Sequence, residues 1–106
     1  MILHFKPLSV NEAWQGKRYK TAKYKKYEVA MLYSLPHDKI PEGKLRIDIT
    51  YGFSNVNSDI DNPTKMFLDI LQKRYNFNDS RIYELNLKKE IVKKGDEFIK
   101  YDIKHI

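Results

Sequence analysis

Residues 45–51, Leu45-Arg46-Ile47-Asp48-Ile49-Thr50-Tyr51, alternate strictly between apolar and polar side chains. Because successive side chains of a β-strand point to opposite faces, this pattern predicts a strand with one buried face and one wet face. A sheet with one apolar face must be covered on that face by other elements. The segment therefore predicts a sheet that helices cover on one side.

The sequence before this strand predicts one short strand and one helix. Residues 1–5 are mostly apolar and end before Pro7, which favours a short first strand. Residues 21–35 have helical periodicity and stop at Pro36. Their apolar positions recur at spacings of three and four, which places them on one helix face: Tyr24, Tyr27, Met31 and Leu35.

The sequence after residue 51 predicts a second helix and two more strands. Pro63 suits the first turn of a helix over residues 63–73, with Asn62 or Asp61 as its cap. Residues 82–92 and 97–103 look like strands joined by a hairpin turn at Lys94-Gly95-Asp96. The predicted order is strand, helix, strand, helix, strand, strand. This order predicts a single α+β domain over residues 1–106, with a mixed sheet and helices on one face.

Composition excludes several classes of protein. The 106 residues contain no cysteine, which excludes disulfides, thiolate nucleophiles and cysteine-type zinc sites. No apolar run reaches the roughly 20 residues that a membrane helix needs, and the N-terminus lacks the pattern of a signal peptide. We therefore expect a cytoplasmic protein with no membrane partner. The formal net charge of +6 favours a polyanionic partner.

Two carboxylates, Asp59 and Asp61, precede Lys65 in a chain that is otherwise basic. If the chain is extended there, both side chains point to the same side and can share a hard cation such as Mg²⁺. Lys65 is then placed to contact a phosphate, and Asp79 offers a third carboxylate from a later loop. These parts suit metal-assisted hydrolysis of a phosphodiester bond.

A purely structural interpretation of the same residues competes with this one. Asp61 can serve as a helix cap, Lys65 and Asp69 as a surface ion pair, and Asp79 as a turn residue. Asp79 also follows the far end of the predicted helix. It must therefore fold back along that helix or come from the second subunit of a dimer, and the sequence does not choose between these routes.

The segment from residue 13 to residue 27 carries six basic residues and no acid, with aromatic residues between them. Basic side chains there would neutralise phosphates, and an exposed aromatic ring could stack on a base. Periodicity assigns Tyr24 and Tyr27 to the core face of the helix instead. The residues before the helix are the better candidates for nucleic-acid contact: Trp14, Lys17, Arg18 and Lys20.

With these motifs in place, the chain resembles the RusA family of Holliday junction resolvases. The similarity spans residues 5–89 and combines an N-terminal stretch, Pro7-Leu8-Ser9-Val10-Asn11, with the acidic run Asp59-Ile60-Asp61-Asn62. Four later matches follow in the family's order: Lys65, Asp69-Ile70-Leu71, Asn78-Asp79 and Lys89. One departure is Asn78, where the family often has a further aspartate.

The resemblance implies a magnesium-dependent endonuclease, with Mn²⁺ as a substitute ion, that nicks four-way DNA junctions as a homodimer. It assigns Asp59, Asp61 and Asp79 to metal binding and catalysis, and Lys65 to catalysis. Asn62 and Asp69 become supporting residues, and Lys89 joins the DNA-contacting set. It also implies a bacterial or phage source. Two other hypotheses remain: a non-catalytic DNA-binding protein, and a metal nuclease acting on other branched DNA.

Overall fold

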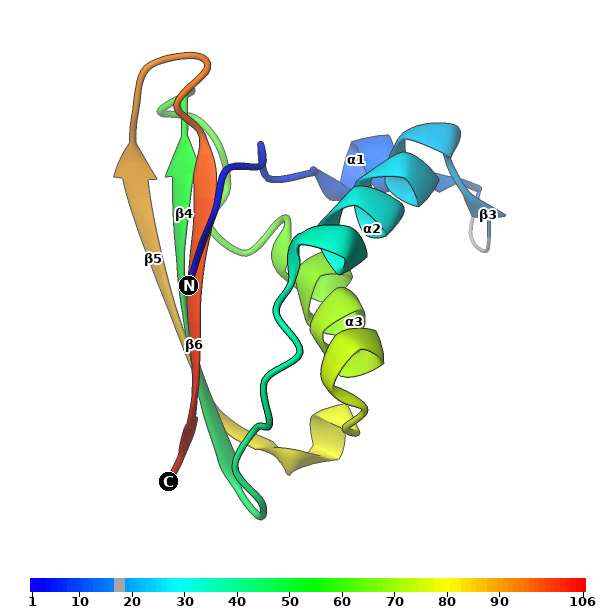
Figure 1. Cartoon of the computed structure of the whole chain (residues 1–106). Coiled ribbons are helices and arrows are strands. Elements are labelled where there is room, and N and C mark those ends of the chain that lie inside the picture. Colours follow the sequence, from blue (N-terminus) through cyan, green and yellow to red (C-terminus); the bar gives the residue numbers. More distant parts are fainter. Residues whose placement is uncertain (17–18) are drawn as a thin grey trace.

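Strand β4 (Leu45–Phe53) lies inside a four-stranded sheet and has a neighbour along each edge (Figure 1). The computed structural model describes residues 1–16 and 19–106 of the chain. Strand β5 (Ile82–Ile91) runs parallel to β4, whereas β6 (Phe98–His105) runs antiparallel to it. Strand β1 (Ile2–Leu3) pairs antiparallel with β6, which gives the order β1-β6-β4-β5. The predicted mixed sheet is confirmed.

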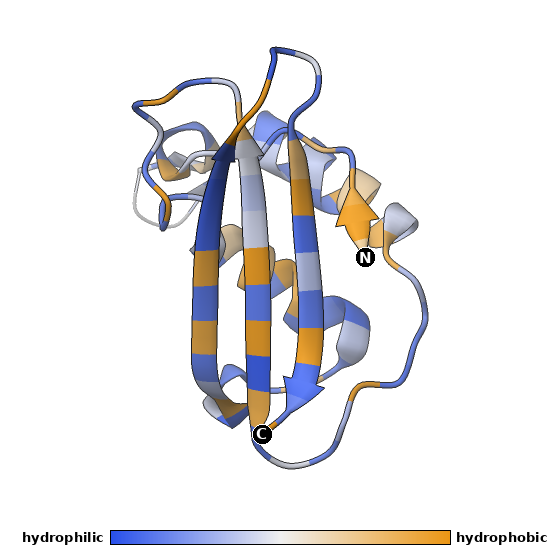
Figure 2. Ribbon diagram, turned by 90° about the vertical axis from the view of Figure 1, so that its left-hand side faces the viewer, coloured by the Kyte–Doolittle hydropathy of each residue, from blue (hydrophilic) through white to orange (hydrophobic). Residues whose placement is uncertain are grey.

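The alternation in β4 divides the sheet into a dry face and a wet face. Leu45, Ile47, Ile49 and Tyr51 are almost completely buried, whereas Arg46, Asp48 and Thr50 between them stay partly accessible. Helices α2 (Ala22–Ser34) and α3 (Thr64–Tyr75) lie on the dry side (Figure 1). Figure 2 looks onto the other face, where polar and apolar bands alternate along the strands. The structure confirms a single α+β domain with helices on one face.

Both long helices bury one apolar face, and that of α2 is the face that its periodicity predicted. In α2, Tyr24, Met31 and the flanking Leu35 are buried, and the side chain of Thr21 caps the first turn. Burying such a face supplies most of the stability of a short helix. In α3 the buried residues also recur at spacings of three and four: Met66, Phe67, Ile70 and Leu71.

The predicted side-chain cap of α3 is wrong. Pro63 occupies the cap position and the helix has no side-chain cap. The amide oxygen of Asn62 instead accepts a hydrogen bond of 2.6 Å from the backbone N–H of Val10, far away in the sequence. Because this tertiary contact uses the cap-type side chain, Asn62 links the start of α3 to the N-terminal segment.

The predicted hairpin between the last two strands is also wrong. Strand β4 lies between β5 and β6, so the turn around Gly95 connects two strands on opposite sides of it. The long apolar β4 gains a neighbour on each edge in this way, which buries it more fully than a terminal hairpin would. Helix α3 supplies the crossover that a parallel β4–β5 pair requires.

Several short elements add to the predicted order. Helix α1 (Val10–Ala13) and the paired strands β2 (Trp14–Gln15) and β3 (Tyr19–Lys20) lie between β1 and α2, where the predicted order has no element. A 3₁₀ turn, η1 (Asp79–Arg81), precedes β5. Among the helices of the described ranges, none is long and apolar enough to cross a membrane.

Candidate functional site

Asp59 and Asp61 lie in the connection between β4 and α3. The chain turns here: the N–H of Asn62 donates to the carbonyl of Asp59 at 3.3 Å, and that of Thr64 to the carbonyl of Asp61 at 3.0 Å. The extended backbone assumed from the sequence is therefore not present. Both carboxylates are exposed, and within residues 1–16 and 19–106 neither takes part in a hydrogen bond or ion pair. They are free to bind a ligand from solvent.

Contacts from two sides hold this connection in place. The ammonium group of Lys89 on β5 donates to the carbonyl oxygens of Val56 at 2.7 Å and Ser58 at 2.6 Å. On the other side, Asn62 accepts the hydrogen bond from Val10. The segment that carries Asp59 is thus tied both to the sheet and to the N-terminal segment, which holds its backbone in place.

The solvent-exposed side of α3 carries a continuous line of polar contacts. The ammonium of Lys65 is 3.2 Å from a carboxylate oxygen of Asp69, the predicted surface pair. The amide of Gln72 donates to the same carboxylate at 3.5 Å, and its oxygen accepts the backbone N–H of Asp79 at 3.2 Å. Asp69 therefore links the proposed catalytic Lys65 to the segment that carries Asp79.

Asp79 begins η1, beyond the far end of α3 from Asp59 and Asp61. A helix of 12 residues is about 18 Å long at 1.5 Å per residue. Within the described part of one chain, no three histidine, cysteine or acidic residues lie close enough to hold a metal ion. One subunit thus brings Asp59 and Asp61 into one loop, and leaves Asp79 at the other end of the helix.

The residues selected for DNA contact have structural partners of their own. The indole of Trp14 is partly buried and packs edge-on against Tyr24, with ring centroids 5.4 Å apart. The ammonium of Lys20 pairs with Glu28 at 2.9 Å and lies 4.9 Å from the centre of the Tyr24 ring. Lys89 is bound to two backbone carbonyls. The other two residues, Lys17 and Arg18, lie outside the described residues.

Glu28 on α2 forms ion pairs with two lysines, Lys20 on β3 and Lys73 on α3. Burial raises its pKa, but hydrogen bonds from Lys73 at 2.8 Å and Lys20 at 2.9 Å outweigh this, and the pKa lies below the usual 4.5. The carboxylate is therefore ionised at neutral pH and joins the two helices electrostatically. This pairing keeps two of the chain's lysines from acting as freely mobile cations.

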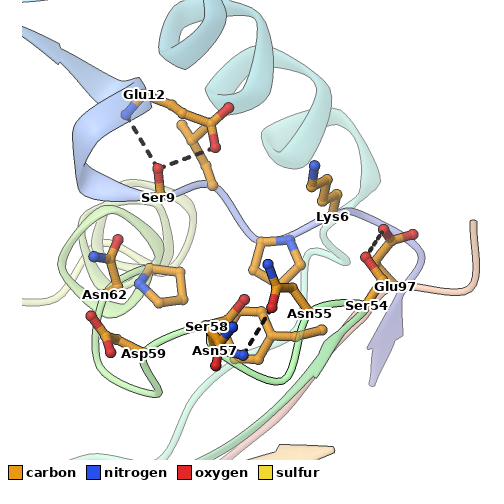
Figure 3. A pocket seen from close by; sticks show the side chains of 14 residues that line it. Lys6, Ser9, Glu12, Ser54, Asn55, Asn57, Ser58, Asp59, Asn62 and Glu97 are labelled. Carbon is orange, nitrogen blue, oxygen red and sulfur yellow. Dashed lines mark hydrogen bonds between the residues drawn. The ribbon is translucent and has the colours of Figure 1, made fainter. Parts of the chain in front are cut away.

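A hollow beside Asp59 contains residues that the sequence did not single out. Its volume is about 460 Å³, and it lies between the N-terminal segment and the β4–α3 connection (Figure 3). Four polar residues of the segment after β4 contribute much of one wall: Ser54, Asn55, Asn57 and Ser58. The sequence did contain one sign of this hollow, a run of amide and hydroxyl residues next to the acidic motif. Nothing in its spacing indicated that Lys6 and Glu97 would lie across from that run.

Comparison with known families assigns the class of protein. The family model described as Endodeoxyribonuclease RusA matches residues 6–100, which include every residue of the β4–α3 connection, α3 and β5. The chain belongs to the RusA endodeoxyribonuclease family. It is therefore a nuclease, and the family implies branched DNA as its substrate. A search of curated proteins finds no match to the chain.

Proposed function

We propose that the protein is a magnesium-dependent endonuclease that resolves four-way DNA junctions as a homodimer, with each active site drawn from both subunits. The observation that carries the nuclease assignment is the family match over residues 6–100. The carboxylates of Asp59 and Asp61, exposed and without a partner among the described residues, support it on a chain of net charge +6. In a protein that only bound DNA, such carboxylates would repel the phosphates.

Within one subunit, the proposed acids supply only some of the ligands that a hard divalent cation needs. Carboxylate oxygens are the ligands that Mg²⁺ prefers, and Asp59 and Asp61 offer them from one short loop. Asp79 is the third acid of the proposal and lies at the opposite end of α3. A cation held by these acids would supply an activated water and would stabilise charge on the phosphorus and the leaving oxygen. Completing the set requires a second subunit.

Strand β5 offers an edge for that second subunit. It is ten residues long and forms one edge of the sheet. The side chain of Leu85 on this strand is 39% exposed. An open strand edge presents unpaired N–H and C=O groups that can pair with another strand. Leu85 and Leu87 lie on the helix-covered face, since they pair with Ile47 and Ile49 of β4.

The sequence of β5 is self-complementary for antiparallel pairing centred on Asn86. In that register Leu85 faces the partner subunit's Leu87 on the helix-covered face. On the open face, Glu84 lies opposite the partner subunit's Lys88. Apolar pairs and opposite charges directly across strands each stabilise a sheet by about 0.2–1 kcal/mol. The pairing would therefore extend the sheet through a two-fold axis without burying an unpaired charge.

This pairing would bring the missing acid to the loop. The last residues of β5 adjoin the β4–α3 connection, as the register Phe53 to Ile91 and the contact of Lys89 with Ser58 demonstrate. Asp79 lies three residues before the first residue of β5. In an antiparallel pair, the start of one β5 lies beside the end of the other. The partner subunit's Asp79 would thus approach Asp59 and Asp61, and the two-fold axis would create two equal sites for two nicks.

The remaining residues take supporting roles in this proposal. Lys65, exposed on the first turn of α3, would contact the phosphate that is cut, and Asp69 would orient its ammonium group. Trp14, Lys17, Arg18 and Lys20 would bind the junction arms, with salt-dependent affinity from the basic residues. Asn62 and Lys89 would hold the loop of Asp59 through their contacts with Val10 and Ser58.

The decisive experiment mixes two inactive variants, Asp61→Asn and Asp79→Asn. If each site uses acids from both subunits, a mixed dimer has one intact site and one doubly damaged site. We expect each variant alone to bind a synthetic junction without metal and to make no nicks with Mg²⁺. We expect the mixture to recover nicking of single strands. No recovery in mixtures verified to contain heterodimers would overturn the shared site.

A substrate panel tests the reaction itself. Native protein should nick a four-way junction with Mg²⁺ or Mn²⁺, and should be inactive when the metal is chelated. Linear duplex, flap and fork DNA of equal length serve as controls. Preferential cleavage of flaps or forks would replace junction resolution with another branched-DNA activity. Absence of cleavage on every substrate would instead indicate a binding protein.

A further inference from the structure

The hollow beside Asp59 has the mixed lining of a small-molecule site. Its volume of about 460 Å³ lies within the ~300–1,000 Å³ typical of ligand pockets. Apolar groups from Pro7, Leu8, Phe53 and Pro63 form part of its wall. Figure 3 shows Asn55, Asn57 and Ser58 gathered on one side, and Ser9 and Glu12 on the opposite side. A flat ring with polar edges matches such a lining.

Existing hydrogen bonds fix how two of the amide side chains present themselves. The oxygen of Asn55 accepts the N–H of Asn57 at 2.9 Å, and the oxygen of Asn62 accepts the N–H of Val10 at 2.6 Å. Each amide therefore keeps its NH₂ group as a donor. Within the described ranges, the side chain of Asn57 and the carboxylate of Asp59 have no hydrogen-bond partner. Both donors and acceptors thus remain available in one wall.

The charges around the hollow select against a phosphate inside it. Of the residues that the structure describes, three carboxylates line it, those of Glu12, Asp59 and Glu97, against one cation, Lys6. Two of these acids already have partners: Lys23 pairs with Glu12, and Ser54 donates to Glu97 at 2.9 Å. An anion would be repelled, whereas the N–H and amino groups of a nucleobase could donate to the free acceptors. Lys6 remains available for a neighbouring phosphate.

We propose that this hollow receives one unstacked base of the DNA, from the nucleotide next to the phosphate that is cut. The proposal deepens the nuclease function proposed above and depends on it. Asp59 connects the two places, because it lines the hollow and is also one of the acids proposed for catalysis. Bases inside a duplex cannot enter a recessed site, so enzymes that read them there must extrude them. A branch point, where base pairs are already strained or open, lowers that cost.

The test combines an altered substrate with an altered hollow. In a series of junctions, each nucleotide flanking the cut is replaced in turn by an abasic residue. Loss of a stacked and hydrogen-bonded base should slow nicking by about 5- to 100-fold at one position. Asn57→Phe should fill the hollow, and it is tolerable there because Asn57 does not have a positive φ angle. This variant should nick more slowly than native protein, and its nicking rate should be the same on intact and abasic junctions.

Two controls separate the proposal from loss of folding and from failure of the nuclease function. Thr50→Phe makes a comparable polar-to-aromatic change on the open face of the sheet, on β4 and away from the β5 edge, and should keep the native response to the abasic series. A junction with 2-aminopurine at the sensitive position, bound by Asp61→Asn protein, should brighten on binding and should not brighten when Asn57→Phe is added. Nicking by native protein without any position-dependent abasic effect would overturn the base site and leave the nuclease standing. No nicking by native protein would overturn the proposed function instead.

Discussion

The ammonium group of Lys89 donates a hydrogen bond of 2.6 Å to the carbonyl oxygen of Ser58, the residue directly before Asp59. A second bond, to Val56, makes this side chain a bridge between β5 and the loop that carries the first acid. Strand β5 also offers the edge proposed for the partner subunit. One lysine therefore couples the position of Asp59 to the strand through which the dimer would form.

Replacing Lys89 should release the loop without unfolding the protein. Lys89→Met keeps the aliphatic stem and removes both hydrogen bonds to carbonyls. We expect a loss of about 1 kcal/mol in unfolding free energy, since charged hydrogen bonds are worth somewhat more but this group is only partly buried. Amide hydrogen exchange should accelerate over residues 54–59. Lys88→Met, on the open face, is the matched control, and equal exchange in both variants would contradict the bridge.

Placing a charge at the β5 edge should separate the subunits. Leu85→Arg puts two like charges close together across the proposed pairing, while Leu85 is already 39% exposed in one subunit. The isolated subunit should therefore lose no more than ~0.5 kcal/mol. We expect light scattering to report monomers and junction nicking to fall at least tenfold. Tyr33→Arg, at a side chain 90% exposed on α2, should remain dimeric. A dimeric Leu85→Arg protein would place the interface elsewhere.

Two lysines on α3 distinguish catalysis from surface pairing. Lys65 pairs with Asp69 at 3.2 Å and Lys73 with Glu28 at 2.8 Å, so both are cations paired on one helix. An exposed pair of this kind contributes about 0.3–0.5 kcal/mol. Lys65→Met should abolish nicking with little change in thermal stability, whereas Lys73→Met should keep nicking. Equal activities in the two variants would reduce Lys65 to a surface residue.

The stability of the protein should fall in acid through Glu28. Its pKa in the folded chain is lowered, because the hydrogen bonds from Lys73 and Lys20 outweigh the opposing effect of burial. A lowered pKa contributes stability that is complete above the usual value of 4.5 and disappears as the pH falls through the folded value. Glu28→Gln should therefore lower the melting temperature at pH 7 and have a smaller effect at pH 3.

Thermal unfolding from pH 3 to pH 7 measures this difference. Glu42→Gln, a change at an exposed carboxylate before β4, is the control. Its melting curve should follow that of the native protein across the range. If Glu28→Gln lowers the melting temperature equally at pH 3 and pH 7, the stabilisation does not come from the ionised carboxylate.

Local periodicity predicted the main elements because burial follows it directly. The alternation at Leu45, Ile47 and Ile49 identified β4, and the spacing from Tyr24 to Met31 identified the buried face of α2. Such patterns reflect one element against one core, which neighbouring residues encode. Local periodicity does not identify which strands are neighbours in the sheet. The turn around Gly95 looked like a hairpin, yet β4 lies between the two strands that it connects.

The sequence likewise predicted only part of the candidate site. The order of the acidic run, Lys65, Asp79 and Lys89 indicated the family, which the match over residues 6–100 confirms. The order of residues in a motif does not give the distances between them in space, because residues of one motif can lie at opposite ends of a helix. The predicted helix already placed Asp79 beyond its far end, but only the fold shows that the loop after α3 does not bring Asp79 back to Asp59 and Asp61 within the described part of one subunit.

The sequence by itself determined the residue types and the building elements: closely spaced carboxylates in a basic chain, two amphipathic helices and a strand with one dry face. Tertiary structure decided what those elements bring together. It gave β4 two neighbours, bound Asn62 to Val10 and Lys89 to Ser58, and left Asp79 away from the other acids. The physical reason is that side-chain type and periodicity are local properties. Contacts between distant segments arise only when the whole chain buries its apolar surface at once.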